Sequence, residues 1–367
     1  MRGVVMRGVV LAIAVATASA DAQLADRPVM IEARVPKAPS VATGANGAFL
    51  VYEIWVTNLE PRELKWTRVE VMDARGRTLH TLAASALWRD LARPGQGNIG
   101  AADRPRLGPT QRAVLFLQVP ITGEAPAELR HRLTITDSIG TRTLALRPTS
   151  VSRDVAVIGP PLRGGNWFAA NGPGNVSGHR RAQIPVDGLP SIAQRFAIDY
   201  VIVDSAFKTY RGDSLKNESY YAEDQDALAV ADGIVVATKD SIPENVPGIN
   251  SRAVPITLET VGGNHVILDI GNGRFAFYAH LRPGSLRAKV GDRVKRGAVL
   301  GKVGTRGTPR NPTSTSTSPT TTRRWGRKES RTCTTSSSWS AAARRSASAA
   351  PRRRPLPSDA CCPSKTK

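Results

Sequence analysis

The stretch "GNHVILDIGNGRFAFYAHL", residues 263–281, decides the fold expected for this chain. Two runs of mostly apolar, β-branched and aromatic residues, 264–270 and 274–280, flank the triplet Gly271-Asn272-Gly273. Glycine adopts positive φ without steric cost, so this triplet favours a tight hairpin turn. We therefore predict two antiparallel strands here, within a domain that is mostly β.

The same rhythm extends around this hairpin and again nearer the N-terminus. In the C-terminal half, strand-like runs lie at 194–204, 226–240, 254–281 and 287–304. In the N-terminal half, runs with period-two alternation lie at 48–63, 65–79, 111–121 and 131–146, and turn residues separate them. Several such strands without long helices favour an antiparallel sandwich over residues 28–157. His80 and His131 fall in this region, and we interpret both as surface or packing residues.

A segment rich in Gly and Pro separates the two halves. It runs from Ile158 to about Arg181, and we take 158–189 as a linker between the sandwich and a second β domain at 190–304. The fold class predicted is therefore all-β: an antiparallel sandwich, then an antiparallel sheet domain, then a tail.

The first 22 residues have the pattern of a secretory signal peptide. Arg2 and Arg7 precede an apolar run at 8–18, and small residues follow up to Ala22. The apolar run is too short for a stable membrane span, although a retained anchor helix is the alternative. No later segment is apolar enough to cross a bilayer. We therefore expect a mature protein that has no transmembrane span and works outside the cytoplasm.

The positive charge of the chain is concentrated in its last 63 residues. The formal net charge is +21, and residues 305–367 hold fourteen basic and two acidic residues, which leaves +9 for residues 1–304. The tail has no Val, Ile, Phe, Tyr, Met or His and a single Leu, so it cannot bury a face large enough to offset the entropy of ordering. We expect it to be disordered. All three cysteines lie in this tail, so the body has neither a disulfide frame nor a thiolate metal site.

Four blocks in a fixed order are similar to one known family. "RFAID", "ALAVADGIVVA", "GNHVILDIGNGRFAFYAHL" and "KVGDRVKRGAVLGKVG" resemble the lysostaphin/LytM-type zinc metallopeptidases, over roughly residues 190–304. This resemblance implies a zinc-dependent metalloendopeptidase that hydrolyses peptide bonds in bacterial peptidoglycan, secreted to the periplasm or the extracellular side of the cell envelope. In that family a His, an Asp and the second His of a His-x-His hold zinc. Zinc lowers the pKa of its bound water to about 7, and a flanking His can then transfer a proton.

The resemblance assigns candidate roles to individual residues. Asp199 matches the metal-ligating Asp, and His280, in "YAHL", matches a catalytic His. Arg195 stands where the early metal-ligating His is expected, and a guanidinium cannot ligate zinc. His179 is the nearby candidate to replace that ligand, the alternative being a solvated histidine. We expect His265 to face a neighbouring strand rather than a metal.

The block expected after "GKVG", a Gly-Asn-Ser/Thr-Gly turn and then Pro-His-Leu-His-Phe, is replaced by "TRGTPRNPTSTSTSP". Thr is encoded by ACN and Ser often by TCN, so residues 313–318, read from the third base of the preceding codon, become NAC and NTC in alternation. NAC encodes His, Asn, Asp or Tyr, and NTC encodes Leu, Phe, Ile or Val. A one-base frame change near Gly304 therefore fits the stretch from Thr305 to Ser318, and the tail is then out of frame.

Without the His-x-His strand, the chain lacks a zinc ligand and a catalytic His, and we predict that it is inactive. One alternative is a non-enzymatic envelope protein that binds cell wall or regulates a cell-wall hydrolase, and Arg195 favours it. Another is that the basic tail binds an anionic polymer. The expected partners are peptidoglycan peptides or a cell-wall hydrolase, and no specific nucleic acid.

Overall fold

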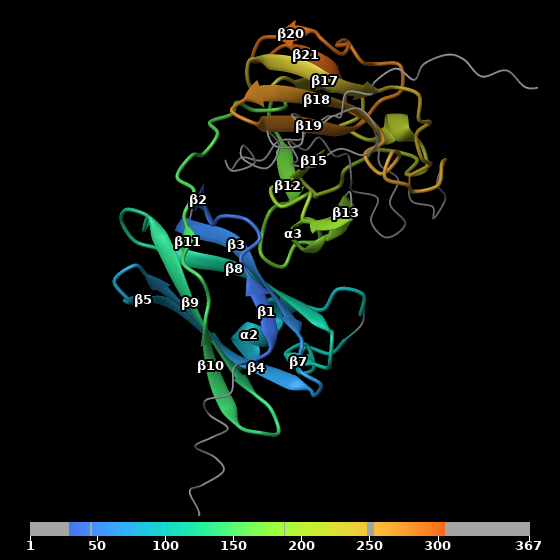
Figure 1. Ribbon diagram of the computed structural model, residues 1–367. Coiled ribbons are helices and arrows are strands. Elements are labelled where there is room, and N and C mark those ends of the chain that lie inside the picture. The colour runs from blue at the N-terminus through green and yellow to red at the C-terminus, as the bar shows by residue number, and fades with distance from the viewer. Residues whose placement is uncertain (1–28, 45, 98, 187, 248–252, 305–367) are drawn as a thin grey trace, which may run out of the picture. The chain divides into compact units, whose positions relative to one another are not determined.

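The computed structural model describes residues 29–304 except 45, 98, 187 and 248–252. Antiparallel β-sheets dominate it, and helices are few and short (Figure 1). The predicted all-β fold class is therefore confirmed. The chain divides into two compact units, Met1–Val151 and Ser152–Lys367, and each is described by itself.

The first unit consists of two sheets. One has the order β1-β3-β8-β6, with β2 paired to β3; its strands are β1 (Ile31–Arg34), β2 (Ser40–Gly44), β3 (Gly47–Asn58), β6 (Leu91–Ala92) and β8 (Arg112–Ile121). The other has the order β10-β9-β4-β5, with β11 paired to β9 and β7 to β4; its strands are β4 (Leu64–Asp73), β5 (Thr78–Ala83), β7 (Arg106–Leu107), β9 (Glu128–Thr136), β10 (Thr141–Ala145) and β11 (Thr149–Ser150). The short helix α2 (Ala84–Asp90) follows β5.

Alternate residues of both sheets meet in one hydrophobic core. Members from the central strands β3, β8, β4 and β9 are Leu50, Tyr52, Ile54, Leu115, Leu117, Trp66, Val69 and Leu133, all of them almost fully buried. This period of two places one face of each strand inside, as the sequence alternation predicts. His131 is one of the buried residues, and its Nε2 lies 2.8 Å from the hydroxyl of Tyr52. It is a packing histidine of the sandwich.

The second unit is built from smaller sheets. A four-stranded sheet has the order β19-β18-β17-β20, and three two-stranded sheets pair β12 with β15, β13 with β14 and β16 with β21. The strands are β12 (Trp167–Asn171), β13 (Ile184–Val186), β14 (Leu189–Ser191), β15 (Asp199–Ile202), β16 (Asp226–Leu228), β17 (Gly233–Lys239), β18 (Asn264–Gly271), β19 (Arg274–Leu281), β20 (Arg293–Val294) and β21 (Val299–Lys302). A short helix α3 (Gly178–Arg181) and a 3-10 turn η1 (Asn217–Ser219) complete it.

The hairpin predicted at 263–281 is present as β18 and β19. Gly271, Asn272 and Gly273 all have positive φ, between +53° and +86°, as a tight turn between the strands requires. The strands bury Val266, Leu268, Ala276 and Tyr278 in a core of their own, together with Val235 of β17. This second core shares no residue with the core of the sandwich.

The segment 158–189, expected as a linker, contains structure that belongs to the second unit. It includes β12, α3 and β13, and Leu162 is buried in the second core. Its glycines and prolines separate short strands instead of separating domains. The Gly/Pro count alone does not distinguish these two uses.

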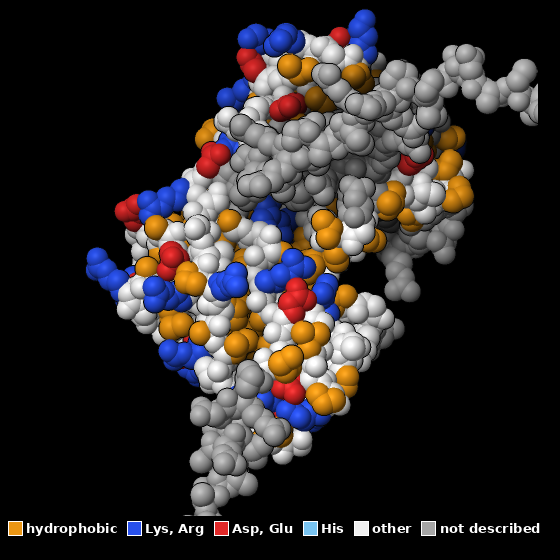
Figure 2. Space-filling model, viewed as in Figure 1, with side chains coloured by type: hydrophobic (Ala, Val, Ile, Leu, Met, Phe, Trp, Pro, Cys, Tyr) orange, Lys and Arg blue, Asp and Glu red, His pale blue; other side chains and the backbone are white. Residues whose placement is uncertain are grey.

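Two predicted segments lie outside the described residues: the signal peptide at 1–22 and the tail at 305–367. Within the described part, no helix is long and apolar enough to span a membrane. On the face drawn in Figure 2, Lys and Arg side chains are interspersed with Asp, Glu and apolar side chains.

Candidate functional site

Three elements of the second unit bring a histidine and a carboxylate together. Asp199 is the first residue of β15, and it pairs directly with Asn171 at the end of β12. His179 lies in α3, one short turn that begins after Ser177. His179 is 6% exposed and Asp199 7% exposed. The two residues that the sequence proposed as metal ligands are therefore buried neighbours, although 20 positions separate them.

The distances in this group are those of a small polar cluster. His179 Nε2 lies 3.3 Å from Asp199 Oδ2. Asn171 Nδ2 lies 3.3 Å from the same ring nitrogen and 3.2 Å from the same carboxylate oxygen. Ser177 Oγ fixes the orientation of the amide, because it donates to Asn171 Oδ1 and accepts the backbone N–H of His179.

The amide of Asn171 bears on the protonation of His179. An amide nitrogen only donates, so a hydrogen bond from it leaves a lone pair on His179 Nε2. Nε2 and the carboxylate oxygen then face each other as two acceptors, an arrangement that favours a cation between them. In the competing state Nε2 carries a proton and donates to Asp199, with Asn171 bonded to the carboxylate alone.

This pair fits zinc in ligand type but not in ligand number. Imidazole nitrogen and carboxylate oxygen are both zinc ligands, and two such atoms at about 2.0–2.1 Å from one tetrahedral ion lie about 3.3 Å apart. A catalytic zinc site needs three protein ligands. The described residues contain no group of three His, Cys, Asp or Glu side chains that could hold a metal ion. The described residues therefore do not complete a catalytic zinc site.

Arg195, at the position of the expected early ligand, lies inside the unit. It is 6% exposed, and burial lowers its pKa to about 10. Arg180, next to His179 in α3, is fully buried. Its pKa is well below the usual value, first through burial and then through the positive charges of Arg195 and Arg181. Both guanidiniums are cations that cannot ligate a metal.

His280 lies near the end of β19 in an unusual backbone conformation. Asn264 pairs with Leu281 and Val266 with Tyr278, so His265 alone faces two residues, Ala279 and His280. This is a β-bulge, which redirects a side chain from its place in the strand alternation. His280 also has φ +58°, a conformation that costs a non-glycine residue on the order of 1–3 kcal/mol and that is found often at functional sites.

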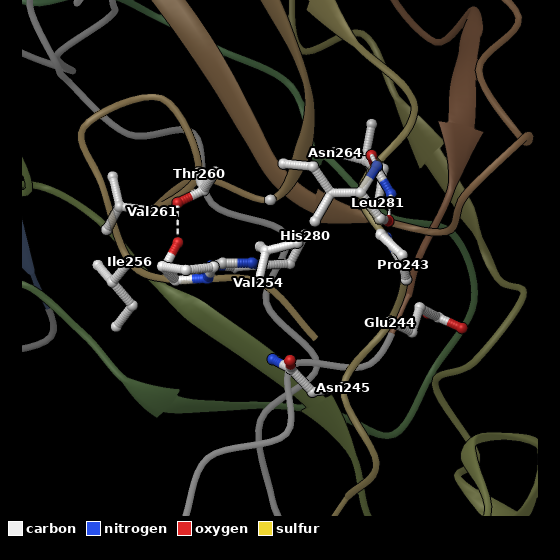
Figure 3. Close-up of a pocket in the computed structure, with 13 residues that line it drawn as sticks. Pro243, Glu244, Asn245, Val254, Ile256, Thr260, Val261, Asn264, His280 and Leu281 are labelled. Atoms are coloured by element: carbon white, nitrogen blue, oxygen red, sulfur yellow. Dashed lines mark hydrogen bonds between the residues drawn. The ribbon is translucent and has the colours of Figure 1, made fainter. Parts of the chain in front are cut away.

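The half-buried side chain of His280 lines a small pocket (Figure 3). The pocket has a volume of about 60 Å³, and its lining includes Asn264, Thr260, Glu244 and several apolar residues. Neither His179 nor Asp199 lines it. The structure thus brings His179 and Asp199 together. In the described part of the chain, it shows no contact between this pair and His280, the third predicted site residue.

His265 packs against the neighbouring strand β19, as the sequence predicts. Its Nδ1 lies 2.8 Å from the carbonyl oxygen of Gly263, and its ring packs against Phe277 with 5.2 Å between centroids. Asn171 is the residue of the candidate site that sequence reasoning missed. It lies in the segment taken as a linker, and no spacing or motif marks it.

Comparison with known proteins gives one sequence match and several weak structural likenesses. Among the solved structures, an M23 peptidase candidate from Pseudomonas aeruginosa is 14% identical with a TM-score of 0.21, over 70% of this chain and 82% of that one. A zinc-containing peptidase from Vibrio cholerae is 12% identical with a TM-score of 0.21, over 77% and 80%. A CARDB domain from Pyrococcus furiosus, in complex with di-metal ions, is 18% identical with a TM-score of 0.18, over 33% and 84%.

A search of the curated proteins gives no match. The sequence model of Peptidase family M23 matches residues 219–317. The match begins later than the resemblance at 190–304 and ends 13 residues beyond Gly304. It covers β16 to β21, and it includes the strand that carries His280. Residues 219–317 of the chain are therefore similar to peptidase family M23.

Proposed function

We propose that the second unit derives from a zinc-dependent endopeptidase of bacterial peptidoglycan and retains half of its metal site. His179 and Asp199 are the retained ligands, and His280 is the retained proton-transfer residue. The observation that carries this proposal is the 3.3 Å approach of His179 Nε2 to Asp199 Oδ2, inside the unit and beside the donor-only amide of Asn171. The family match at 219–317 supports a peptidase ancestry.

The chain as written is inactive in this proposal. Its five histidines are His80, His131, His179, His265 and His280, and no two of them form a His-x-His. His131 belongs to the sandwich core, and His265 is bonded to the carbonyl of Gly263. The chain's own residues can therefore position a carboxylate and two imidazoles, but they do not complete a hydrolytic centre.

Zinc titration by calorimetry tests the proposal on two proteins. The full chain as written should show no zinc site with a nanomolar dissociation constant. A protein translated from the gene with the frame restored near Gly304 should bind zinc tightly and cleave peptidoglycan, and His179→Ala or Asp199→Ala should remove both properties. His80→Ala, a histidine change in the first unit, is the matched control. Tight zinc binding by the chain as written, or an unaffected restored protein with His179→Ala, would refute the assignment.

A second candidate function is a non-catalytic envelope protein that binds cell wall or a cell-wall hydrolase. The buried Arg195 at the expected ligand position favours it, because a fixed cation in the interior opposes metal binding nearby. Sedimentation of the full chain with purified peptidoglycan distinguishes the two functions. Saturable binding without cleavage, in the restored protein as well, supports the second.

A further inference from the structure

The backbone of His280 is held by Gly262, which precedes β18, and by Gly304, which follows β21. Its backbone N–H donates to Gly262 O at 2.9 Å, and its carbonyl accepts the N–H of Gly304 at 3.1 Å. Both backbone groups of His280 are therefore fixed at the bulge. The imidazole lies next to Gly263, with Nδ1 2.8 Å from the position that a Cβ would take there.

Gly263 has no room for a side chain on the side of this imidazole. A Cβ at Gly263 would lie 2.8 Å from His280 Nδ1 and 3.4 Å from His280 Cα, and Gly263 has φ +57°. A Cβ at Gly262 would lie 2.6 Å from the ring of Phe277. Contacts below 3.0 Å force one partner to move, so two adjacent glycines are required for the rings to approach the backbone as they do.

Two side chains fix the glycine pair in place. Asn264 is buried, and it accepts the N–H groups of Ser241 and Ile242 and donates to Ile242 O. His265 Nδ1 lies 2.8 Å from Gly263 O. Since a carbonyl oxygen only accepts, this ring nitrogen carries the proton and donates. The carbonyl of Gly263 is thus held by His265, and the next residue, Asn264, is anchored by its own side chain.

We propose that Gly263, with its peptide fixed by the hydrogen bond from His265, is the positioning residue for the imidazole of His280. The bulge in β19 directs the ring toward Gly263, and the missing Cβ leaves the space that Nδ1 needs. The ring can then line the small pocket with Asn264. The inference rests on the proposed role of His280 as a proton-transfer residue, and it adds the device that sets the place of the ring.

The test reads the ring directly and does not need activity. Long-range ¹H–¹⁵N spectra of the full chain report the imidazoles of its five histidines, and a His280→Gln spectrum assigns the signals of His280. Gly263→Ala should shift the ring signals of His280 and leave those of His131 in place. Gly271→Ala is the matched control, because Gly271 also has positive φ, at +86°, and nothing lies within 4 Å of its Cβ position. It should cost stability through backbone strain and leave the His280 signals unchanged.

A second variant, His265→Phe, tests the same positioning of His280 if Gly263→Ala does not fold. His265→Phe preserves ring packing on Phe277 and removes the hydrogen bond to Gly263, so it should also shift the signals of His280. Unchanged His280 signals in every folded variant, or equal shifts in Gly263→Ala and Gly271→Ala, would overturn the proposal. This failure is separate from failure of the proposed function. An active restored protein with unshifted His280 signals in Gly263→Ala would reject Gly263 and retain the enzyme.

Discussion

One buried histidine of the first unit, His131, has a lowered pKa. His131 is fully buried, its Nε2 lies 2.8 Å from Tyr52 Oη, and burial lowers its pKa to about 4. The unfolded chain binds the proton with a pKa near 6.5. Because the pKa is depressed in the folded state, the stability from a neutral His131 is present above pH 6.5. It is lost as the pH falls toward 4.

This linkage predicts how His131→Phe behaves. Protonation of His131 should lower the unfolding free energy of the wild-type full chain by about 2 kcal/mol between about pH 7.5 and about pH 5. The variant has no imidazole at this position and should lack this part of the pH dependence. Urea unfolding at both values measures the difference. His80→Asn is the control, because burial lowers the pKa of His80 too but that side chain is only half-buried. Equal pH dependence in wild type and His131→Phe would contradict the assignment.

The residues of the candidate site were only partly predictable. Asp199 and His280 follow from the block order, and His179 follows from asking which histidine could replace the ligand missing at Arg195. Asn171 could not be found, because a lone Asn at the end of a short strand has no periodicity or spacing to mark it. Whether His179 approaches Asp199 depends on the pairing of β12 with β15, which joins segments about 30 residues apart.

Among the elements, a buried charge cluster joins the β9–β10 turn to the loop between β3 and β4. Asp137 lies in the turn and bonds Arg62 and Arg142; Glu60 bonds the same two arginines. The side chains of Asp137, Glu60 and Arg142 are at most 6% exposed. Removing one partner leaves the others as buried charges with fewer counterions, which is costly.

Arg142→Met is therefore expected to destabilise the first unit by about 3–5 kcal/mol. Arg130→Met is the matched control, because Arg130 lies in the neighbouring strand β9 and pairs with Glu128 near the surface, where such a pair contributes about 0–1 kcal/mol. Denaturant unfolding of the full chain measures both. Similar losses in the two variants would show that the cluster is worth no more than a surface ion pair.

The strands themselves were largely predictable from the sequence, whereas their irregularities were not. The alternation at 48–63 and 111–121 predicts β3 and β8, and Gly271-Asn272-Gly273 predicts the turn after β18. In these segments the conformational preference of the residues and the burial of the apolar ones favour the same structure. The bulge at Ala279 and His280 is invisible to a period-two pattern. It goes with a contact between β19 and the segment before β18, in which the N–H of His280 donates to the carbonyl of Gly262.

At the scale of the whole molecule, the separation of the two cores has a thermodynamic consequence. The units Met1–Val151 and Ser152–Lys367 have hydrophobic cores without a common residue. Units with separate cores can unfold separately. Calorimetry of the full chain should therefore resolve two transitions, with Arg142→Met lowering only one midpoint and Gly271→Ala only the other. A single transition that both variants lower equally would show that the units unfold as one cooperative body.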